Sequence, residues 1–210
     1  MAVERTDRQV RSIQVPMQTR AAGSDGDMKI EGYFAVFDDE TLLYDSEYYR
    51  EYEKIDRHAF DNTLKSEDVR ALINHEDASV LGRTKAGTLT LRTDDKGLWG
   101  SIDVNPNDTE AVNLYERVKR GDVDQCSFGF SILDEDHTTE NREGEPTETH
   151  YTIKRVKLYE VSVCTFPAYE NTGVEARSKK ASETRRETLE TRKQRLKERL
   201  KNGIKTTDFE

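Results

Sequence analysis

The segment from Gln125 to Ile132 alternates large apolar side chains with very small ones, and this alternation limits how the chain can fold. At the two-residue period of a β-strand, one face is apolar and is expected to be buried: Cys126, Phe128, Phe130 and Ile132. The opposite face carries only small side chains: Ser127, Gly129 and Ser131. A strand that lacks bulk on one face allows another backbone to approach it. We therefore expect a peptide to bind there and Ser127 to attack it.

Composition limits the size of the core and determines the sign of the net charge in each part of the chain. The 210 residues allow one domain with tails, and only 33% are hydrophobic while 36% are charged. Typical globular domains have about 45–50% and about 25%, so either the core is small or part of the chain is unfolded. Residues 176–210 carry a net charge of +6 and the remainder −15. An acidic body argues against nucleic-acid binding, whereas the basic tail is either a solvated helix or a contact for nucleic acid or an acidic partner.

Two cysteines lie far apart, at positions 126 and 164, and form no Cys-x-x-Cys pair. This spacing favours a reducing compartment and indicates no metal framework. Neither a signal peptide nor a run of the ~20 apolar residues that a membrane span needs is evident. We expect an intracellular, soluble protein without a membrane, metal or cofactor requirement.

The pattern along the chain predicts three regions. Residues 1–27 are polar and are expected to form a flexible arm with at most one short strand, residues 28–176 the folded domain, and residues 177–210 a charged helical tail. Within the domain we predict an α+β arrangement of strands and two helices, with loops over 38–54 and 134–149. The strands are 28–37, 69–75, 88–92, 98–104 and 125–132, followed by 150–156 and 158–166 as two strands or one long bent strand. The helices are 55–64 and 111–121.

Three polar residues fall on separate predicted strands in positions suited to chemistry. His75 ends an apolar strand, Ser127 lies on the open face of another, and Glu160 is placed inside a third, where a buried carboxylate needs a partner. Serine is a weak nucleophile at neutral pH and needs a base, which in turn needs a group that fixes its tautomer. This set therefore predicts serine hydrolysis.

Other interpretations of the same residues remain open. His75 fits a half-buried side chain bonded to a carbonyl, and Glu160 fits a salt bridge to Arg83 or Arg155. A hydrolase using paired carboxylates such as Glu160 and Asp103 is a further alternative, although no motif supports it.

Several segments together resemble the tailed-phage prohead proteases, which are capsid-maturation serine proteases distantly similar to the herpesvirus assemblins. The resemblance covers residues 28–175 and rests on the order and spacing of these segments: Glu31–Phe37, Ile55–Leu64, Leu72–Glu76, Leu81–Arg83, Gly97–Trp99, Ala111–Gly121, Cys126–Phe130, Leu158–Val163 and Pro167–Tyr169. It implies a mainly antiparallel β-barrel flanked by a few helices. It also implies cleavage of capsid or scaffold segments, and of the chain's own termini, inside the immature capsid in the bacterial host. Dimerisation is a property of assemblin-like enzymes.

The resemblance also assigns roles. His75 matches the base, Ser127 the nucleophile and Glu160 the acidic position, with His150 the alternative third member because assemblin-like enzymes use a second histidine. Backbone N–H groups near Gly82 and Arg83 are candidate oxyanion donors. The alternative from another class is a catalytically inactive scaffold or assembly chaperone of the capsid, with the basic tail docked on the shell or portal.

Overall fold

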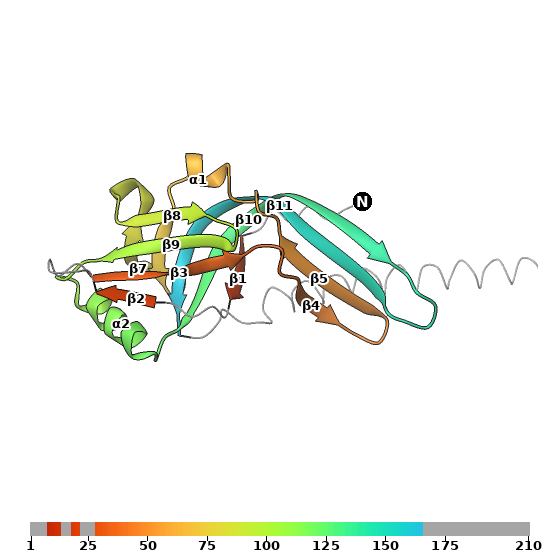
Figure 1. Cartoon of the computed structure of the whole chain (residues 1–210), viewed down its shortest axis with the longest axis horizontal. Coiled ribbons are helices and arrows are strands. Elements are labelled where there is room, and N and C mark those ends of the chain that lie inside the picture. Colours follow the sequence, from red (N-terminus) through yellow and green to blue (C-terminus); the bar gives the residue numbers. More distant parts are fainter. Residues whose placement is uncertain (1–7, 14–17, 22–27, 166–210) are drawn as a thin grey trace, which may run out of the picture. The chain divides into compact units, whose positions relative to one another are not determined.

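The computed structural model describes residues 8–13, 18–21 and 28–165, which form two β-sheets with short helices at their margins (Figure 1). The predicted charged helix at 177–210 lies outside the described residues. The larger sheet has seven strands, in the order β1-β10-β11-β5-β4, with β6 also paired to β11 and β7 to β6. Its members are β1 (Gln9–Ile13), β4 (Thr41–Asp45), β5 (Tyr49–Ile55), β6 (Arg70–Ile73), β7 (Glu76–Arg83), β10 (Gln125–Glu140) and β11 (Thr147–Cys164).

The smaller sheet has four strands in the order β2-β3-β9-β8. They are β2 (Gln18–Ala21), β3 (Met28–Val36), β8 (Leu89–Thr93) and β9 (Gly97–Val104). Strands β5 and β6 run parallel to β11, and the other pairings between described strands are antiparallel. The fold is thus mainly antiparallel β-sheet with few helices, as predicted, but the strands described here form two sheets and no closed barrel.

Helices are few and short. Helix α2 (Thr109–Arg120) packs on β2, β3 and β9, below the smaller sheet in Figure 1. It begins where Asp108 accepts hydrogen bonds from two backbone N–H groups of the first turn, and it ends at Gly121, whose φ of 86° suits a residue without a Cβ atom. Helix α1 (Thr63–Ser66) is a single turn, and the 3-10 turn η1 (Thr84–Ala86) connects β7 to β8.

The apolar face of β10 is buried as its alternation predicts. Cys126, Phe128 and Phe130 are fully buried, and the rings of Phe128 and Phe130 stack with centroids 4.8 Å apart. Phe60 contacts the Phe128 ring edge-on at 5.8 Å. This aromatic cluster fixes one face of β10 against the core, so the other face of the strand is available for polar groups.

Two predicted loops are strands instead. Residues 134–149 belong to a long hairpin of β10 and β11, and residues 38–54 contain β4 and β5, which lie alongside that hairpin (Figure 1). The predicted helix 55–64 is also shorter than expected, because β5 extends to Ile55 and α1 begins at Thr63. The N-terminal segment contributes two strands, β1 and β2, where the sequence indicated at most one.

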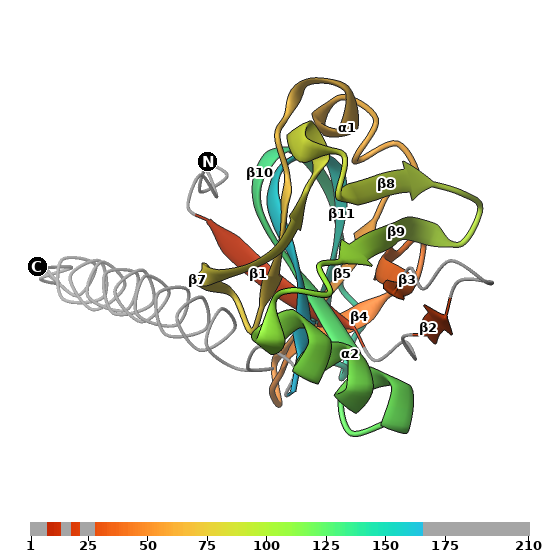
Figure 2. The same cartoon turned by 90° about the vertical axis from the view of Figure 1, so that its left-hand side faces the viewer.

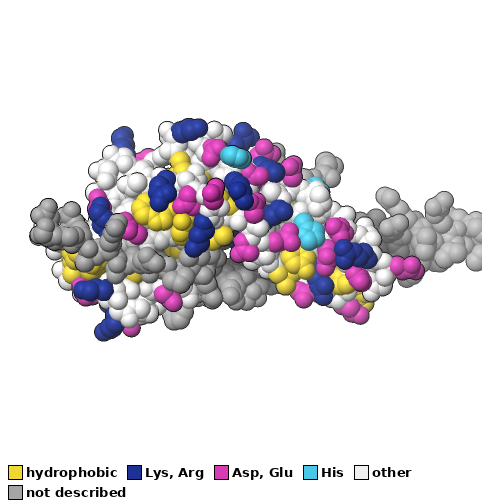
Figure 3. Space-filling view, in the orientation of Figure 1, with side chains coloured by type: hydrophobic (Ala, Val, Ile, Leu, Met, Phe, Trp, Pro, Cys, Tyr) yellow, Lys and Arg dark blue, Asp and Glu magenta, His cyan; other side chains and the backbone are white. Residues whose placement is uncertain are grey.

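The described surface mixes both signs of charge. On the face shown in Figure 3, Lys and Arg side chains lie among Asp and Glu side chains. No helix in the described part of the chain is long and apolar enough to cross a membrane. Among the same residues, no group of His, Cys, Asp and Glu side chains is arranged to hold a metal ion.

Candidate active site

His75 lies in the two-residue turn that joins β6 to β7. Ile73 pairs with Glu76 across the turn, and the two residues between them, Asn74 and His75, have φ values of 49° and 63°. Positive φ at both central residues is the requirement of a type I′ hairpin turn, which suits asparagine and is costly for most other side chains. The strained turn therefore places the imidazole at a fixed point beside β11.

Asn74 fastens this turn to the end of β11. Its backbone N–H donates to the carbonyl of Val163 at 3.1 Å, and its Oδ1 accepts from the backbone N–H of Thr165 at 2.9 Å. Both bonds are made to the edge of β11 that pairs with β6. Asn74 is therefore a positioning residue for the imidazole of the next residue.

Glu160 is the acceptor for that imidazole. It is 1% exposed, its Oε1 accepts from Nδ1 of His75 at 2.8 Å, and its Oε2 accepts from the hydroxyl of Ser162 at 2.6 Å. The guanidinium of Arg8 lies 3.5 Å from Oε1. A carboxylate bound in this way fixes the Nδ1–H tautomer of His75 and leaves Nε2 as the nitrogen that can accept a proton.

At Gly129, the space on the β10 face that carries small side chains is occupied by Glu160 and not by the predicted peptide. Gly129 pairs with Glu160 across the strands, and a Cβ atom at its position would lie 2.2 Å from Glu160 Oε1. The volume left by the missing side chain is thus filled by the carboxylate of Glu160.

Ser127 lies on the same face of the sheet as this cluster. It is fully buried and pairs with Ser162 on one side and with Ser12 of β1 on the other. Directly opposed residues in an antiparallel pair have Cβ atoms about 4.5–5.5 Å apart, so Ser127 is next to the hydroxyl that binds Glu160. Its own hydroxyl donates to the backbone carbonyl of Arg11 at 2.7 Å.

His150 is not part of this cluster. It precedes Glu160 by ten residues on β11, which is roughly 30 Å at ~3.3 Å per residue. Its Nδ1 bonds Glu40 at 2.9 Å and its ring stacks on Tyr52 at 4.8 Å. Of the two candidates for the third member, only Glu160 contacts His75.

The structure also places Arg83 and Asp103, two residues that the sequence offered as partners of Glu160. Arg83 does not pair with Glu160, because its guanidinium binds Asp68 and holds the pKa of that carboxyl at about 2. The N–H of Arg83 donates to the side chain of Thr88, so this group is already engaged and is not an oxyanion donor in this arrangement. Asp103 pairs with Lys29 at 2.5 Å on the smaller sheet, apart from Glu160 on the larger one.

Both cysteines are buried thiols. Cys164 lies 3.7 Å from Nε2 of His75, and burial, together with the charge of Glu160, raises the pKa of its thiol to about 12. Burial likewise raises the pKa of Cys126 to about 12, and its Sγ faces the carbonyl of Tyr33. Thiolates are the nucleophilic form of cysteine, so neither residue competes with Ser127 for that role at neutral pH.

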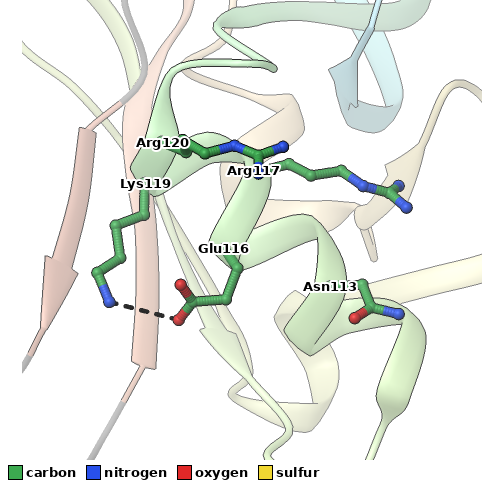
Figure 4. Close-up of a pocket in the computed structure, with 5 residues that line it drawn as sticks. All are labelled: Asn113, Glu116, Arg117, Lys119 and Arg120. Atoms are coloured by element: carbon green, nitrogen blue, oxygen red, sulfur yellow. Dashed lines mark hydrogen bonds and ion pairs between the residues drawn. The ribbon is translucent and has the colours of Figure 1, made fainter.

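A separate hollow lies along α2 (Figure 4). Polar side chains line it: Asn113, Glu116, Arg117, Lys119 and Arg120. Figure 4 shows them projecting from one helix, with an ion pair between Lys119 and Glu116. Its lining includes no Ser, Cys or His side chain, so it does not repeat the set of groups found at Ser127 and His75.

Sequence reasoning missed Ser162 and Arg8 as neighbours of the carboxylate. The signal for Ser162 was present, since residues two apart on a strand share a face and Ser162 follows Glu160 at that spacing. Arg8 gave no signal, because its position depends on the pairing of β1 with β10. A serine on the same sheet face as a histidine that a buried carboxylate orients fits the set of groups found in serine hydrolases.

Comparison with known proteins agrees with this class. Residues 15–187 match the family described as caudovirus prohead serine protease, and the chain belongs to this family. It is 34% identical over 88 residues to the prohead protease of Enterobacteria phage HK97, which covers 41% of this chain. The match spans about a third of that relative's length (36%). No solved structure matches the chain.

Proposed function

We propose that this chain is a serine endopeptidase of prohead maturation, with Ser127 as nucleophile, His75 as general base and Glu160 as the residue that orients the base. The observation that carries the proposal is the 2.8 Å hydrogen bond from His75 Nδ1 to the buried Glu160, on the same sheet face as Ser127. Family membership supports the same reaction class.

The reaction follows from these positions. His75 Nε2 takes the proton of Ser127 as its oxygen attacks the peptide carbonyl, and Glu160 stabilises the imidazolium that forms. The imidazolium then protonates the departing amine, and water hydrolyses the acyl-enzyme by the same route. For catalysis the Ser127 hydroxyl has to turn from the carbonyl of Arg11 toward His75.

The substrates proposed for this site are segments of the capsid or scaffold protein and the chain's own termini, inside the immature capsid in the host cytoplasm. The name of the HK97 relative, a prohead protease, supports this setting. A homodimer is a further part of the proposal, which light scattering of the purified chain tests.

The test is coexpression of the chain with its capsid protein, followed by mass spectrometry of both. Ser127→Ala is expected to lower processing by roughly 10⁴-fold or more, as removal of a serine nucleophile does elsewhere. Ser131→Ala is the matched control, since Ser131 lies four residues along the same face and bonds only the Tyr159 hydroxyl among the contacts described. Equal processing by the wild type and Ser127→Ala contradicts the proposal, and no processing by the wild type favours the inactive scaffold.

A further inference from the structure

Strand β1 occupies the edge of the sheet beside the candidate nucleophile. It pairs antiparallel with β10 over five residues, from Gln9 opposite Phe130 to Ile13 opposite Cys126 (Figure 2). Addition of an extended segment to a sheet edge is a general way in which proteins bind peptides. The chain's own N-terminal segment therefore lies where an extended substrate would reach Ser127.

The hydroxyl of Ser127 contacts one peptide bond of β1. The hydroxyl of Ser127 donates to the carbonyl oxygen of Arg11 at 2.7 Å, and Ser12 is the residue paired with Ser127. The carbonyl of the Arg11–Ser12 bond is thus within hydrogen-bond distance of the candidate nucleophile.

The side chain of Arg11 enters a recess on the face of the sheet opposite to that of the Ser127 side chain. Its Nε and Nη2 donate to the two carboxylate oxygens of Glu53 at 2.5 and 2.9 Å, and its guanidinium lies 5.6 Å from the centroid of the Phe130 ring. Glu53 is 4% exposed. The recess of about 80 Å³ around this pair is lined by apolar side chains, including Leu43 and Phe128, and also by Asp39, Thr41 and Lys54. A two-point contact of this kind distinguishes a basic side chain from a neutral one.

A buried ion pair can simply fasten a strand to a sheet. Here, however, one residue supplies both the carbonyl at the nucleophile and the side chain in the recess. In a protease, the residue whose carbonyl is attacked is also the one that a specificity recess recognises. We propose that β1 is bound as a substrate, that Arg11–Ser12 is a self-cleavage site, and that Glu53 selects a basic residue before the cleaved bond. This inference rests on the proposed function of Ser127.

The chemical step is ordinary acyl transfer. Ser127 Oγ forms a bond to the carbonyl carbon of Arg11, its proton passes to His75, and the bond from that carbon to the nitrogen of Ser12 breaks as His75 returns the proton to the amine. Water then releases Arg11 as a carboxylate. Residues 1–11 leave and Ser12 becomes the new N-terminus.

Cleavage would also change the site. While β1 is present, no other peptide can pair with this edge of β10, so the uncut chain is closed to other substrates. Arg8 also lies 3.5 Å from the Glu160 oxygen that binds His75, so its guanidinium competes with the imidazole for that oxygen. Loss of residues 1–11 would remove both obstacles, and other substrates would then need Arg or Lys before their cleaved bond.

The first experiment follows the N-terminus of the full-length chain by mass spectrometry over time. The wild type and Arg11→Lys are expected to yield a chain that begins at Ser12, while Ser127→Ala stays whole and Arg11→Ala is cut roughly 100-fold more slowly at this bond. A wild-type chain that remains whole at this bond, yet cuts other peptides in a Ser127-dependent way, overturns the inference and leaves the proposed function standing. Continued self-cleavage in Ser127→Ala overturns the proposed function itself.

The second experiment tests the recess with a synthetic peptide of residues 7–16 and its Arg11→Ala counterpart. The processed enzyme is expected to cut the arginine peptide roughly 100-fold faster. Glu53→Gln, which keeps the side-chain shape, should reduce that preference to a few-fold, while Glu51→Gln on the same strand keeps it. Equal preference in the Glu53→Gln and wild-type enzymes, with both cutting the arginine peptide, overturns the role of Glu53.

Discussion

Gly129 and Glu160 face each other across β10 and β11, and the space between them holds only one side chain. Glu160 fills it, with Oε1 on His75 and Oε2 on Ser162. A buried carboxylate without partners costs several kcal/mol, and the contacts with His75 and Ser162 offset that cost. The glycine is therefore part of the site, although it has no side chain that reacts.

Gly129→Ala tests this relation directly. The added methyl group would lie 2.2 Å from Glu160 Oε1, so the carboxylate has to leave its place beside His75. We expect proteolysis to fall by at least 100-fold and the free energy of unfolding to fall by about 1–3 kcal/mol, as overpacking of a filled interior does. Peptide cleavage assays and urea denaturation measure the two effects.

Ser131→Ala is again the control on the same strand, since its hydroxyl bonds Tyr159 and not the carboxylate. A Gly129→Ala variant with unchanged cleavage rates would show that the position of Glu160 does not limit the reaction. A variant that does not fold is recognised by its circular dichroism and is then replaced by Glu160→Gln, which tests the charge alone.

The turn between β6 and β7 is the element that presents His75. Its two central residues both have positive φ, and Asn74 Oδ1 also accepts from the N–H of Thr165. The turn is thus held by its backbone hydrogen bond to Val163 and by the side-chain bond to Thr165, against the cost of a left-handed conformation at Asn74. Substitutions at position 74 separate the side-chain bond from the conformational cost.

Asn74→Ala and Asn74→Gly form that pair. Both remove the bond to Thr165, but only alanine has to adopt a left-handed conformation that its Cβ atom disfavours. We expect Asn74→Gly to be more stable to urea than Asn74→Ala by about 1 kcal/mol, with the faster cleavage rate also in the glycine variant. Equal stability of the two variants would mean that the turn relaxes without cost.

The long hairpin of β10 and β11 shows where sequence reasoning at this scale stops. The period-two pattern from Gln125 to Ile132 predicted both the strand and which of its faces meets the apolar core, but the opposite face, with Ser127 and Ser131, is buried as well. Beyond it, residues 134–140 are mostly exposed on both faces, so no apolar alternation marks them as a strand. Only the hydrogen-bonded partner across the ladder determines such a strand, and a partner is not visible in a local pattern.

Strand pairing is likewise invisible to local sequence patterns at the scale of the whole molecule and of the site. Polar residues inside apolar strands identified His75, Ser127 and Glu160 as candidates, because burial of a polar group demands a partner. The contact of His75 with Glu160, and the lack of one with His150, depend on the parallel pairing of β6 with β11. The role of β1 depends on a pairing between residues more than 100 positions apart, as in Ser12 with Ser127, which no local signal encodes.

Asp68 braces the region where the chain passes from the larger sheet to the smaller one. It precedes β6 and binds the guanidinium of Arg83 at the end of β7, and it accepts from the N–H of Lys85 in η1. The hydrogen bond from Arg83 is the main cause of its lowered pKa, about 2 compared with an ordinary value of 3.8. The brace therefore depends on ionisation of one carboxyl group.

This lowered pKa gives a defined dependence of global stability on acid. A carboxyl whose pKa is lower in the folded state stabilises that state above the unfolded value, and the contribution is lost as pH falls from about 4 toward 2. Asp68→Asn removes the titrating group, so the urea midpoints of wild type and variant should differ at pH 5–7 and converge toward pH 2. Glu143→Gln, at an exposed carboxylate in the hairpin turn, should show no such convergence. A difference between wild type and Asp68→Asn that stays constant from pH 7 to pH 2 would show that the Arg83 contact does not depend on the charge of Asp68, and the brace would then rest on packing alone.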